Sequence, residues 1–368
     1  MRGALPLIFC FSKDVLAIHS RWRLEFLRYL NIFETLYSFE RRATVLSETG
    51  LRERYRTLRK LLPKAANHEV AAMTHPAVNM SVKPDVKGFF DEATNTITYV
   101  VKDPGSNACA VIDSVMDIDY AAGRITFSHA DHVIADVVAR GLELQWLIET
   151  HVHADHLSAA PYIQEKLGGK IGIGRNITII QDTFGKIFNE GTEFQRDGSQ
   201  FDRLFDDGDT YTVGTMPAFV MHTPGHTPAC MTHVMGDAAF VGDTLFMPDS
   251  GSARADFPGG DAGVLFDSIQ KVLALPDEMR LFMCHDYGAN GGREIRWEST
   301  VAEEKANNIH VGGGKSREEF IAMRKARDAQ LDMPKLIIPS LQVNMRAGQL
   351  PPAEEDGKTY LKVPVNKL

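Results

Sequence analysis

The chain has 368 residues, of which 44% are hydrophobic and 24% are charged, the proportions of an ordinary globular protein. Its apolar runs are shorter than the ~20 residues that a bilayer span requires, so we predict no membrane association. The net charge of −8 argues against nucleic acid as a main partner, because phosphate binding needs clustered positive charge. Four cysteines (Cys10, Cys109, Cys230 and Cys284) form no CxxC pair, which favours reduced thiols and a cytoplasmic location.

The charge divides the chain into two unequal parts. Residues 1–67 carry 13 Lys/Arg against 6 Asp/Glu, a net charge of +7, so the remainder carries −15. We expect residues 1–80 to be a basic helical extension that is poorly packed or disordered, or that precedes the native start. Residues 81–368 are expected to form the folded domain. The sequence leaves a homodimer open.

The predicted elements begin near residue 85. Strands are expected at 96–101 and 108–113, then a helix at 131–140, a mostly apolar strand at 144–150 and a helix at 157–167. Further strands are expected at 170–174, 210–213, 218–222, 230–235 and 238–241, and helices near 177–188, 263–274 and 297–308. Strands with helices interspersed along the whole chain predict an α/β protein whose sheets are covered by helices.

A histidine-rich motif follows the predicted strand at 144–150. His151, His153, Asp155 and His156 place four metal-binding side chains within six residues. Alternate residues of an extended segment point the same way, so we expect His151, His153 and Asp155 to converge on one face. Imidazole nitrogen and carboxylate oxygen suit zinc or divalent iron. A solvated His-rich turn would not explain why a buried strand leads directly into the motif. The sequence therefore predicts a metal site.

Three later segments each place a potential metal ligand at or just after the end of an apolar strand. His226 lies in a Thr-Pro-Gly-His-Thr-Pro turn, where proline and glycine fix its direction. Asp243 follows a glycine at the end of an apolar strand, where a buried carboxylate needs a partner such as a metal. His285 ends another apolar run. Ligand sites in layered α/β folds lie at the C-terminal ends of strands, so these side chains are expected to join the histidine motif.

In chain order, the motifs HxHxDH, PGH, GD and CHDY resemble the pattern of the metallo-β-lactamase superfamily. The resemblance runs from about residue 85 to the C-terminus. It implies an α/β (α+β) fold, the αβ/βα four-layer sandwich, with a metal site between the edges of two sheets. It also implies that the domain 81–368 is catalytic.

The segment 249–260, with its run Ala-Arg-Ala-Asp-Phe-Pro-Gly-Gly, resembles the persulfide dioxygenases, also called sulfur dioxygenases. Glyoxalase II enzymes typically have a GRFFEG-type segment here. The dioxygenase resemblance implies one Fe²⁺ per chain, held by His151, His226 and Asp243, a two-histidine, one-carboxylate set that leaves positions open for substrates. The implied reaction oxidises glutathione persulfide with O₂ to sulfite and glutathione. His153, Asp155, His156 and His285 would then orient ligands or substrate.

The residues also allow a different enzyme. A hydrolase resembling glyoxalase II, acting on glutathione thioesters, would hold two Zn²⁺ ions. His151, His153 and His226 would bind one ion, Asp155, His156 and His285 the other, and Asp243 would bridge them. A purely structural metal is the least favoured interpretation, because structural zinc sites are usually closed and often rich in cysteine.

Five residues are candidates for catalysis or substrate binding. His285 and Tyr287 are the catalytic candidates, and the Tyr287 hydroxyl is also expected to contact substrate. Arg254 is a candidate for binding a glutathione carboxylate through its guanidinium fork. An ion pair with Asp256 is the equally weighted alternative. Lys305 and Asn308 are weaker candidates for the glutathione end, since such residues are more often a solvated helix face.

Overall fold

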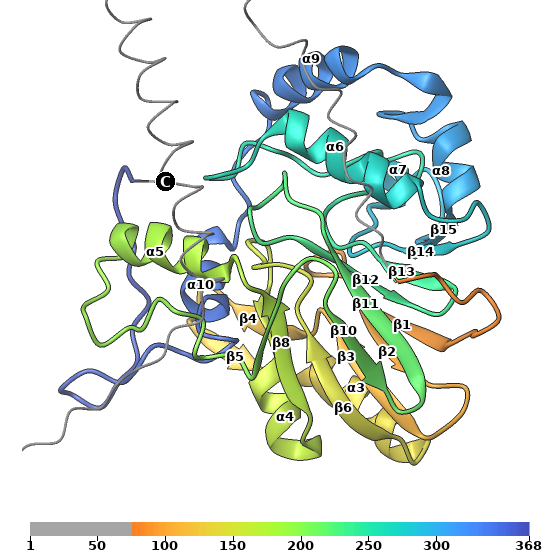
Figure 1. The fold of residues 1–368 in the computed structure, drawn as a ribbon. Helices are drawn as coiled ribbons and strands as arrows, with labels where there is room; N and C mark the ends of the chain where they lie inside the picture. The colour runs from red at the N-terminus through yellow and green to blue at the C-terminus, as the bar shows by residue number, and fades with distance from the viewer. Residues whose placement is uncertain (1–75, 368) are drawn as a thin grey trace, which may run out of the picture. The chain divides into compact units, whose positions relative to one another are not determined.

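The computed structural model describes residues 76–367 (Figure 1). The predicted basic extension over residues 1–80 lies almost wholly outside the described residues. Those described fall within one compact unit, Met73–Leu368. Within residues 76–367, no helix combines the length and the apolar character that a bilayer crossing demands.

The first of two large sheets contains six strands in the order β1-β2-β3-β6-β8-β9. Its first three strands are antiparallel hairpin neighbours, and β6, β8 and β9 add in parallel. The strands are β1 (Asp85–Asp91), β2 (Thr96–Lys102), β3 (Ala108–Ile112), β6 (Glu143–Ile148), β8 (Lys170–Gly174) and β9 (Arg203–Phe205). Residues of β2 and β3 are almost all buried, as expected for strands covered on both faces.

The second sheet also has six strands, in the order β10 to β15. Only the pair β13 and β14 is parallel, because α6 connects these two strands. The strands are β10 (Thr210–Val213), β11 (Met216–His222), β12 (Met231–Met235), β13 (Ala238–Phe240), β14 (Arg280–Phe282) and β15 (Glu298–Thr300). A small third sheet pairs β4 (Val115–Asp119) with β5 (Arg124–Thr126) and β7 (Leu157–Ser158).

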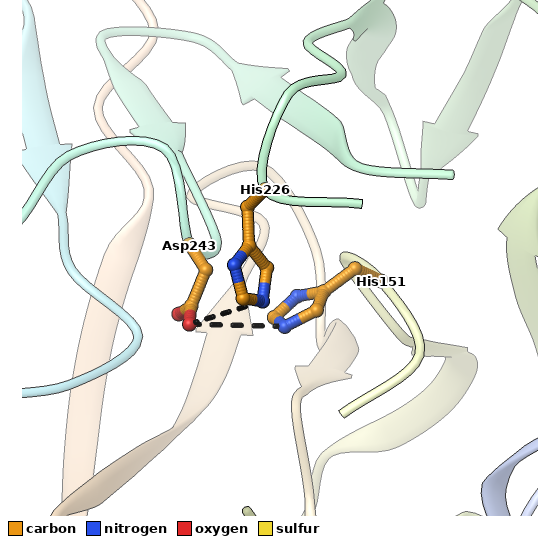
Figure 2. A group of neighbouring side chains, drawn as sticks. All are labelled: His151, His226 and Asp243. Atoms are coloured by element: carbon orange, nitrogen blue, oxygen red, sulfur yellow. Dashed lines mark ion pairs between the residues drawn. The ribbon is translucent and has the colours of Figure 1, made fainter. Parts of the chain in front are cut away.

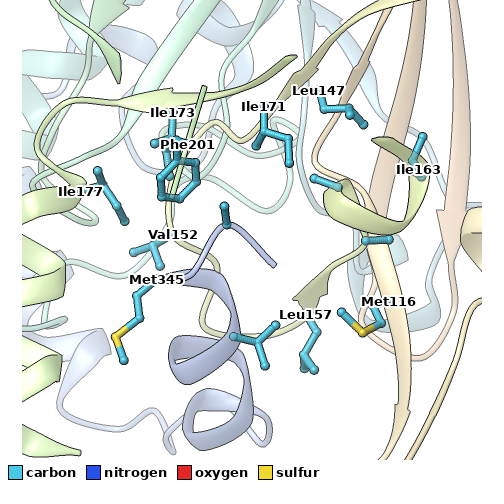
Figure 3. Close-up of a cluster of buried hydrophobic side chains, with 14 of the residues drawn as sticks. Met116, Leu147, Val152, Leu157, Ile163, Ile171, Ile173, Ile177, Phe201 and Met345 are labelled. Carbon is cyan, nitrogen blue, oxygen red and sulfur yellow. The ribbon is translucent and has the colours of Figure 1, made fainter. Parts of the chain in front are cut away.

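Helices cover the outer face of each large sheet (Figure 1). The first sheet packs against α3 (Ser128–Ala139), α4 (Ala160–Leu167), α5 (Ile177–Ile187) and α10 (Ile337–Asn344). Figure 3 shows part of this core, where Ile163 of α4 and Ile177 of α5 lie near Ile171 and Ile173 of β8. The second sheet packs against α6 (Ala262–Leu273), α8 (Val301–Asn307) and α9 (Arg317–Asp328). The short helix α7 (Gly288–Gly291) and a 3-10 turn (Gly312–Gly314) complete this half.

A third core lies between the two sheets. Tyr99 of β2 makes edge contacts with Phe240 of β13 and Phe282 of β14, with ring centroids 5.4 and 5.5 Å apart. Its hydroxyl donates to the carbonyl of Met283, so the ring is packed and its polar end is satisfied. Two sheets packed face to face between two helical layers form the predicted αβ/βα four-layer sandwich.

Most predicted elements are confirmed, with two corrections. Strands β8 and β10 have the predicted bounds, α5 ends one residue earlier than predicted, and α6 begins and ends one residue earlier than predicted. The predicted helix at 157–167 is wrong at its start, because Leu157 and Ser158 pair with β4 and the helix begins at Ala160. The predicted helix at 297–308 is wrong in the same way, since 298–300 pair with β14 before α8 begins.

Candidate metal centre

Three loops bring His151, His226 and Asp243 together at one end of the sheets. They follow β6, β11 and β13 respectively, so both sheets contribute (Figure 2). Asp243 Oδ2 lies 3.6 Å from Nε2 of His226 and 4.0 Å from Nε2 of His151. One donor atom from each residue lies within 4.8 Å of the other two, and all three residues are buried. These distances are too long for hydrogen bonds and suit donors that converge on an ion.

The orientation of His151 depends on Thr150 and Asp113. Thr150 donates to Asp113 through both its main-chain N–H and its hydroxyl, at 2.8 and 2.9 Å. The hydroxyl oxygen can then accept from Nδ1 of His151, 3.0 Å away. That contact fixes the tautomer and leaves Nε2 of His151 as the lone-pair nitrogen that faces Asp243.

His226 is positioned by the glycine before it and by a carbonyl group. Gly225 has φ +135°, and a Cβ there would lie 2.3 Å from the backbone of Leu265, so only glycine allows this turn. Nδ1 of His226 donates to the carbonyl oxygen of Arg254 at 2.8 Å, which turns Nε2 toward Asp243. The predicted stiff turn therefore delivers the imidazole as expected.

A second group of donors lies beside the first and is made by His153, Asp155, His156 and His285. The first three have donor atoms within 4.8 Å of one another, and Nε2 of His285 lies 3.2 Å from Asp155 Oδ2. Nε2 of His285 is also 3.3 Å from Asp243 Oδ1. The Asp243 carboxylate therefore faces both groups, one oxygen toward each.

The segment that carries His151, His153 and Asp155 is not the extended strand on which the sequence prediction relied. Residues 149–156 form a loop with bends, so the alternation of an extended strand does not apply. His151 joins the first group, while His153 and Asp155 join the second. Nδ2 of Asn344, in α10, holds this loop by donating to the carbonyl oxygens of His153 and His156.

The hydrogen bonds of all five histidines fit metal ligation. Each ring has one nitrogen that contacts a protein oxygen and a second nitrogen that points into the site. The inner nitrogens of His151, His153, His156 and His285 are buried and make no hydrogen bond within residues 76–367, and neither does Asp243 Oδ1, since the close carboxylate contacts of His285 lack hydrogen-bond geometry. Buried polar atoms normally have hydrogen-bond partners. A cluster of buried imidazole nitrogens and a carboxylate oxygen without such partners therefore fits a metal ion, which would accept their lone pairs.

The acidic neighbours of two histidines oppose the effect of burial on their pKa. Burial alone would lower the pKa of His153, but Asp113 at 3.0 Å and Glu149 at 3.2 Å raise it well above the ordinary value. Burial would also lower the pKa of His285, and Asp155 with Asp243 raises it instead. His151 has no such partner at hydrogen-bond distance, and burial holds its pKa well below the ordinary value. A neutral imidazole is the form that binds metal.

A cavity of about 890 Å³ opens onto the two groups. Asp155, His226, Asp243, His285 and Tyr287 are among its lining residues. The Tyr287 ring lies 6.3 Å from that of His285, so the structure brings both catalytic candidates to the cavity.

Arg254 also lines the cavity, but its guanidinium is already engaged. It binds both carboxylate oxygens of Asp256, at 2.6 and 2.8 Å, and donates to the carbonyl of Asp332 at 2.7 Å. The ion pair considered as an alternative is thus present. Whether Arg254 also binds substrate stays a prediction.

The other two substrate candidates are not brought to the cavity. Lys305 pairs with Asp277 on the surface at 2.6 Å. Asn308 is buried, and its amide donates to the carbonyl of Gly251 and to Glu304. Neither residue is among those that line the cavity. Both side chains connect α8 to neighbouring loops. The residue pattern of the helix did not reveal these contacts.

Asp113, Glu149 and Asn344 support the site and were missed from the sequence. Asp113 has φ +51°, an uncommon conformation for a non-glycine residue, which aims its carboxylate at Thr150 and His153. The only signal for Asp113 was its position directly after a buried strand. Asn344 lies far along the chain, in a segment where no element was predicted.

Comparison with known proteins agrees with this geometry. Residues 93–285 match the Metallo-beta-lactamase superfamily. The chain therefore belongs to the metallo-β-lactamase superfamily, and it is a metal-dependent enzyme of that fold.

Two relatives and one solved structure illustrate what the chain is similar to. The chain is 57% identical over 293 residues to a probable metallo-hydrolase of Burkholderia pseudomallei, covering 77% of this chain and 99% of that protein. It is 29% identical over 266 residues to the mitochondrial persulfide dioxygenase ETHE1 of Homo sapiens, and the match covers 72% of this chain and 88% of that protein. The crystal structure of ETHE1 from Myxococcus xanthus matches with a TM-score of 0.57 at 29% identity, covering 72% of this chain and all of that one.

Proposed function

We propose that this protein is an iron-dependent persulfide dioxygenase that acts on glutathione persulfide. The observation that carries the proposal is the set of His151, His226 and Asp243, two histidines and one carboxylate with donor atoms within 4.8 Å of one another beside a large cavity. Such a set is characteristic of non-haem Fe²⁺ oxygenases. The resemblance of the segment 249–260 to persulfide dioxygenases and the 29% identity to two ETHE1 proteins support the same assignment.

The reaction consumes glutathione persulfide, O₂ and water and releases glutathione, sulfite and two protons. Iron bound by the three residues would supply adjacent open positions that bring O₂ and the terminal sulfur together. The chain's own residues shape the space around them. Tyr287 and His285 line the cavity and can hydrogen-bond the substrate, and the buried ligands exclude water from the inner side of the site.

A second candidate is a hydrolase that acts on glutathione thioesters with two Zn²⁺ ions. The observation in its favour is Asp243, which directs one oxygen toward His226 and the other toward His285. The unsatisfied inner nitrogens of His153 and His156 also fit a second ion. The 57% identity to a probable metallo-hydrolase is compatible with this alternative.

Metal analysis of anaerobically purified protein, combined with O₂ uptake on glutathione persulfide, separates the two candidates. The dioxygenase should contain about one iron per chain and consume O₂. Two zinc ions per chain with thioester cleavage and no O₂ uptake would overturn the proposal.

Single variants test the number of metals. His226→Ala should lose iron and activity together, whereas His156→Ala should keep most of its iron if the site holds one ion. His132→Ala, in an exposed position on α3, is the matched control and should behave as wild type.

A further inference from the structure

Four cationic side chains line the cavity, and two of them have acidic partners. Arg254 is paired with Asp256, and Arg324 is buried and paired with Asp328 at 2.7 Å. A guanidinium that is already neutralised in this way gains less from a second anion than a free one does. These two residues are therefore part of the cavity wall.

The remaining two cations, Arg327 and Lys335, differ in their exposure and in having no acidic partner. Arg327 lies in the last turn of α9 and Lys335 in the segment before α10, and both are exposed and line the cavity. Neither has an ion-pair partner in the part of the chain that the structure describes. Their positive charges are thus available at the wall of the cavity that holds the metal ligands.

Other parts of the same wall carry acidic groups without a cation beside them. Asp117 and Asp119 of β4 line the cavity and accept hydrogen bonds from main-chain N–H groups, of His129 and Ala122 respectively. Neither is ion-paired within residues 76–367. A ligand that fills the cavity therefore meets free positive and free negative charge, an arrangement that disfavours polyanions and fits a zwitterion.

We propose that Arg327 and Lys335 bind the carboxylate of a zwitterionic thiol carrier and set the enzyme's preference for it. This inference rests on the proposed function in that the carrier's sulfur must reach the metal site. Glutathione has the required chemistry, with two carboxylates, one ammonium group and a central thiol. Charge-assisted hydrogen bonds from these cations to a carboxylate are the strong kind, so they are expected to dominate recognition.

Calorimetric titration of the metal-loaded full chain with reduced glutathione and with glutathione diethyl ester tests the inference. The ester keeps the ammonium group and the thiol, but an ethyl group caps each carboxylate and removes its charge. Wild type should bind glutathione roughly tenfold or more tightly than the ester. Arg327→Gln and Lys335→Gln should each weaken glutathione binding and leave ester binding unchanged. The double variant should bind both compounds equally. Lys325→Gln, also on α9 but away from the cavity, is the control and should match wild type.

The inference is overturned if wild type does not bind glutathione, or binds it no better than the ester. It is also overturned if the double variant keeps the wild-type preference. Binding of the thiol needs no turnover, so this experiment is independent of the reaction. If O₂ uptake is absent while the double variant loses its preference, the dioxygenase proposal fails and the role of Arg327 and Lys335 stands.

Discussion

The carbonyl oxygen of Arg254 holds the metal-site histidine His226 through a 2.8 Å hydrogen bond from Nδ1. The guanidinium of the same arginine is bound by Asp256 and by the carbonyl of Asp332. Arg254 thus connects the segment beside α10 to an imidazole of the metal centre. Its side chain and its main chain act on different parts of the site.

We therefore expect Arg254→Ala to lower metal occupancy, because the loop that carries the carbonyl group loses two attachments. Asp256→Ala should have the same effect, since it breaks the same ion pair. Metal content and kcat per bound metal are to be measured together. If Arg254→Ala instead raises KM several-fold at full metal occupancy while Asp256→Ala does not, Arg254 binds substrate directly.

Asp113 should be the most costly single residue to remove around the site. Its carboxylate binds Thr150 and His153 while fully buried, and removing one partner of a buried ion pair costs about 3–5 kcal/mol. Urea unfolding of Asp113→Ala should show a loss of this size. Asp119→Ala, an exposed change on β4, should alter the unfolding free energy by less than about 0.5 kcal/mol. A similar loss of unfolding free energy in both variants would contradict the supporting role of Asp113.

Asn308→Ala should destabilise the fold and leave substrate affinity unchanged. The side chain joins Glu304 to the carbonyl of Gly251, so its loss leaves buried polar groups unsatisfied, at about 1–3 kcal/mol. Lys305→Ala, which breaks only a surface pair, should be nearly neutral. Thermal unfolding and KM measured on both variants check this. A raised KM at unchanged stability would restore Asn308 as a substrate-binding residue.

Acid should weaken the fold partly through Asp103. Burial alone would raise its pKa, but hydrogen bonds from Ser106, Gly105 and Thr215 lower it to about 2. Because this folded-state pKa is below the unfolded value of 3.8, the stabilisation is complete above about pH 4 and is lost as the pH falls toward 2. Asp103→Asn should therefore lose about 2 kcal/mol at pH 7 and little at pH 2. Equal losses of unfolding free energy at pH 7 and pH 2 would show that the Asp103 carboxylate is not the source of the acid sensitivity.

A chain that begins at Met73 should bind metal and turn over substrate with unchanged kcat/KM. The reason is that the basic residues 1–72 precede every ligand motif, and the compact unit Met73–Leu368 contains the complete metal centre. Metal analysis and steady-state kinetics on the shortened chain are the test. Loss of solubility or of metal would show that the N-terminal residues support the fold.

The candidate metal ligands could be predicted because each follows an apolar strand, a pattern that periodicity reveals. His151, His226, Asp243 and His285 all follow this rule. The two-residue strand β7 could not be predicted, because its pairing with β4 depends on residues 41 and 43 positions earlier in the chain, Met116 for Leu157 and Val115 for Ser158.

The contacts that support the candidate ligands also could not be predicted from local sequence patterns. Asn344 reaches the histidine loop from 191 positions away. The sequence alone could not decide whether Arg254 pairs with substrate or with Asp256, because that choice depends on the tertiary fold. Local sequence therefore indicated the candidate ligands, whereas the residues that support them became evident only from the tertiary fold.

The candidate metal centre draws its residues from both sheets, with His151 after a strand of the first sheet and His226 and Asp243 after strands of the second. An ion held by all three would add a cross-link between two layers that are otherwise joined by side-chain packing and by a few hydrogen bonds, such as that from the Ile97 N–H to the carbonyl of Cys284. By mass action, an ion that binds only the folded state stabilises it by about 4 kcal/mol when its free concentration is a thousand times Kd. Chelation should therefore lower the melting temperature and first increase hydrogen exchange along the seam between the sheets.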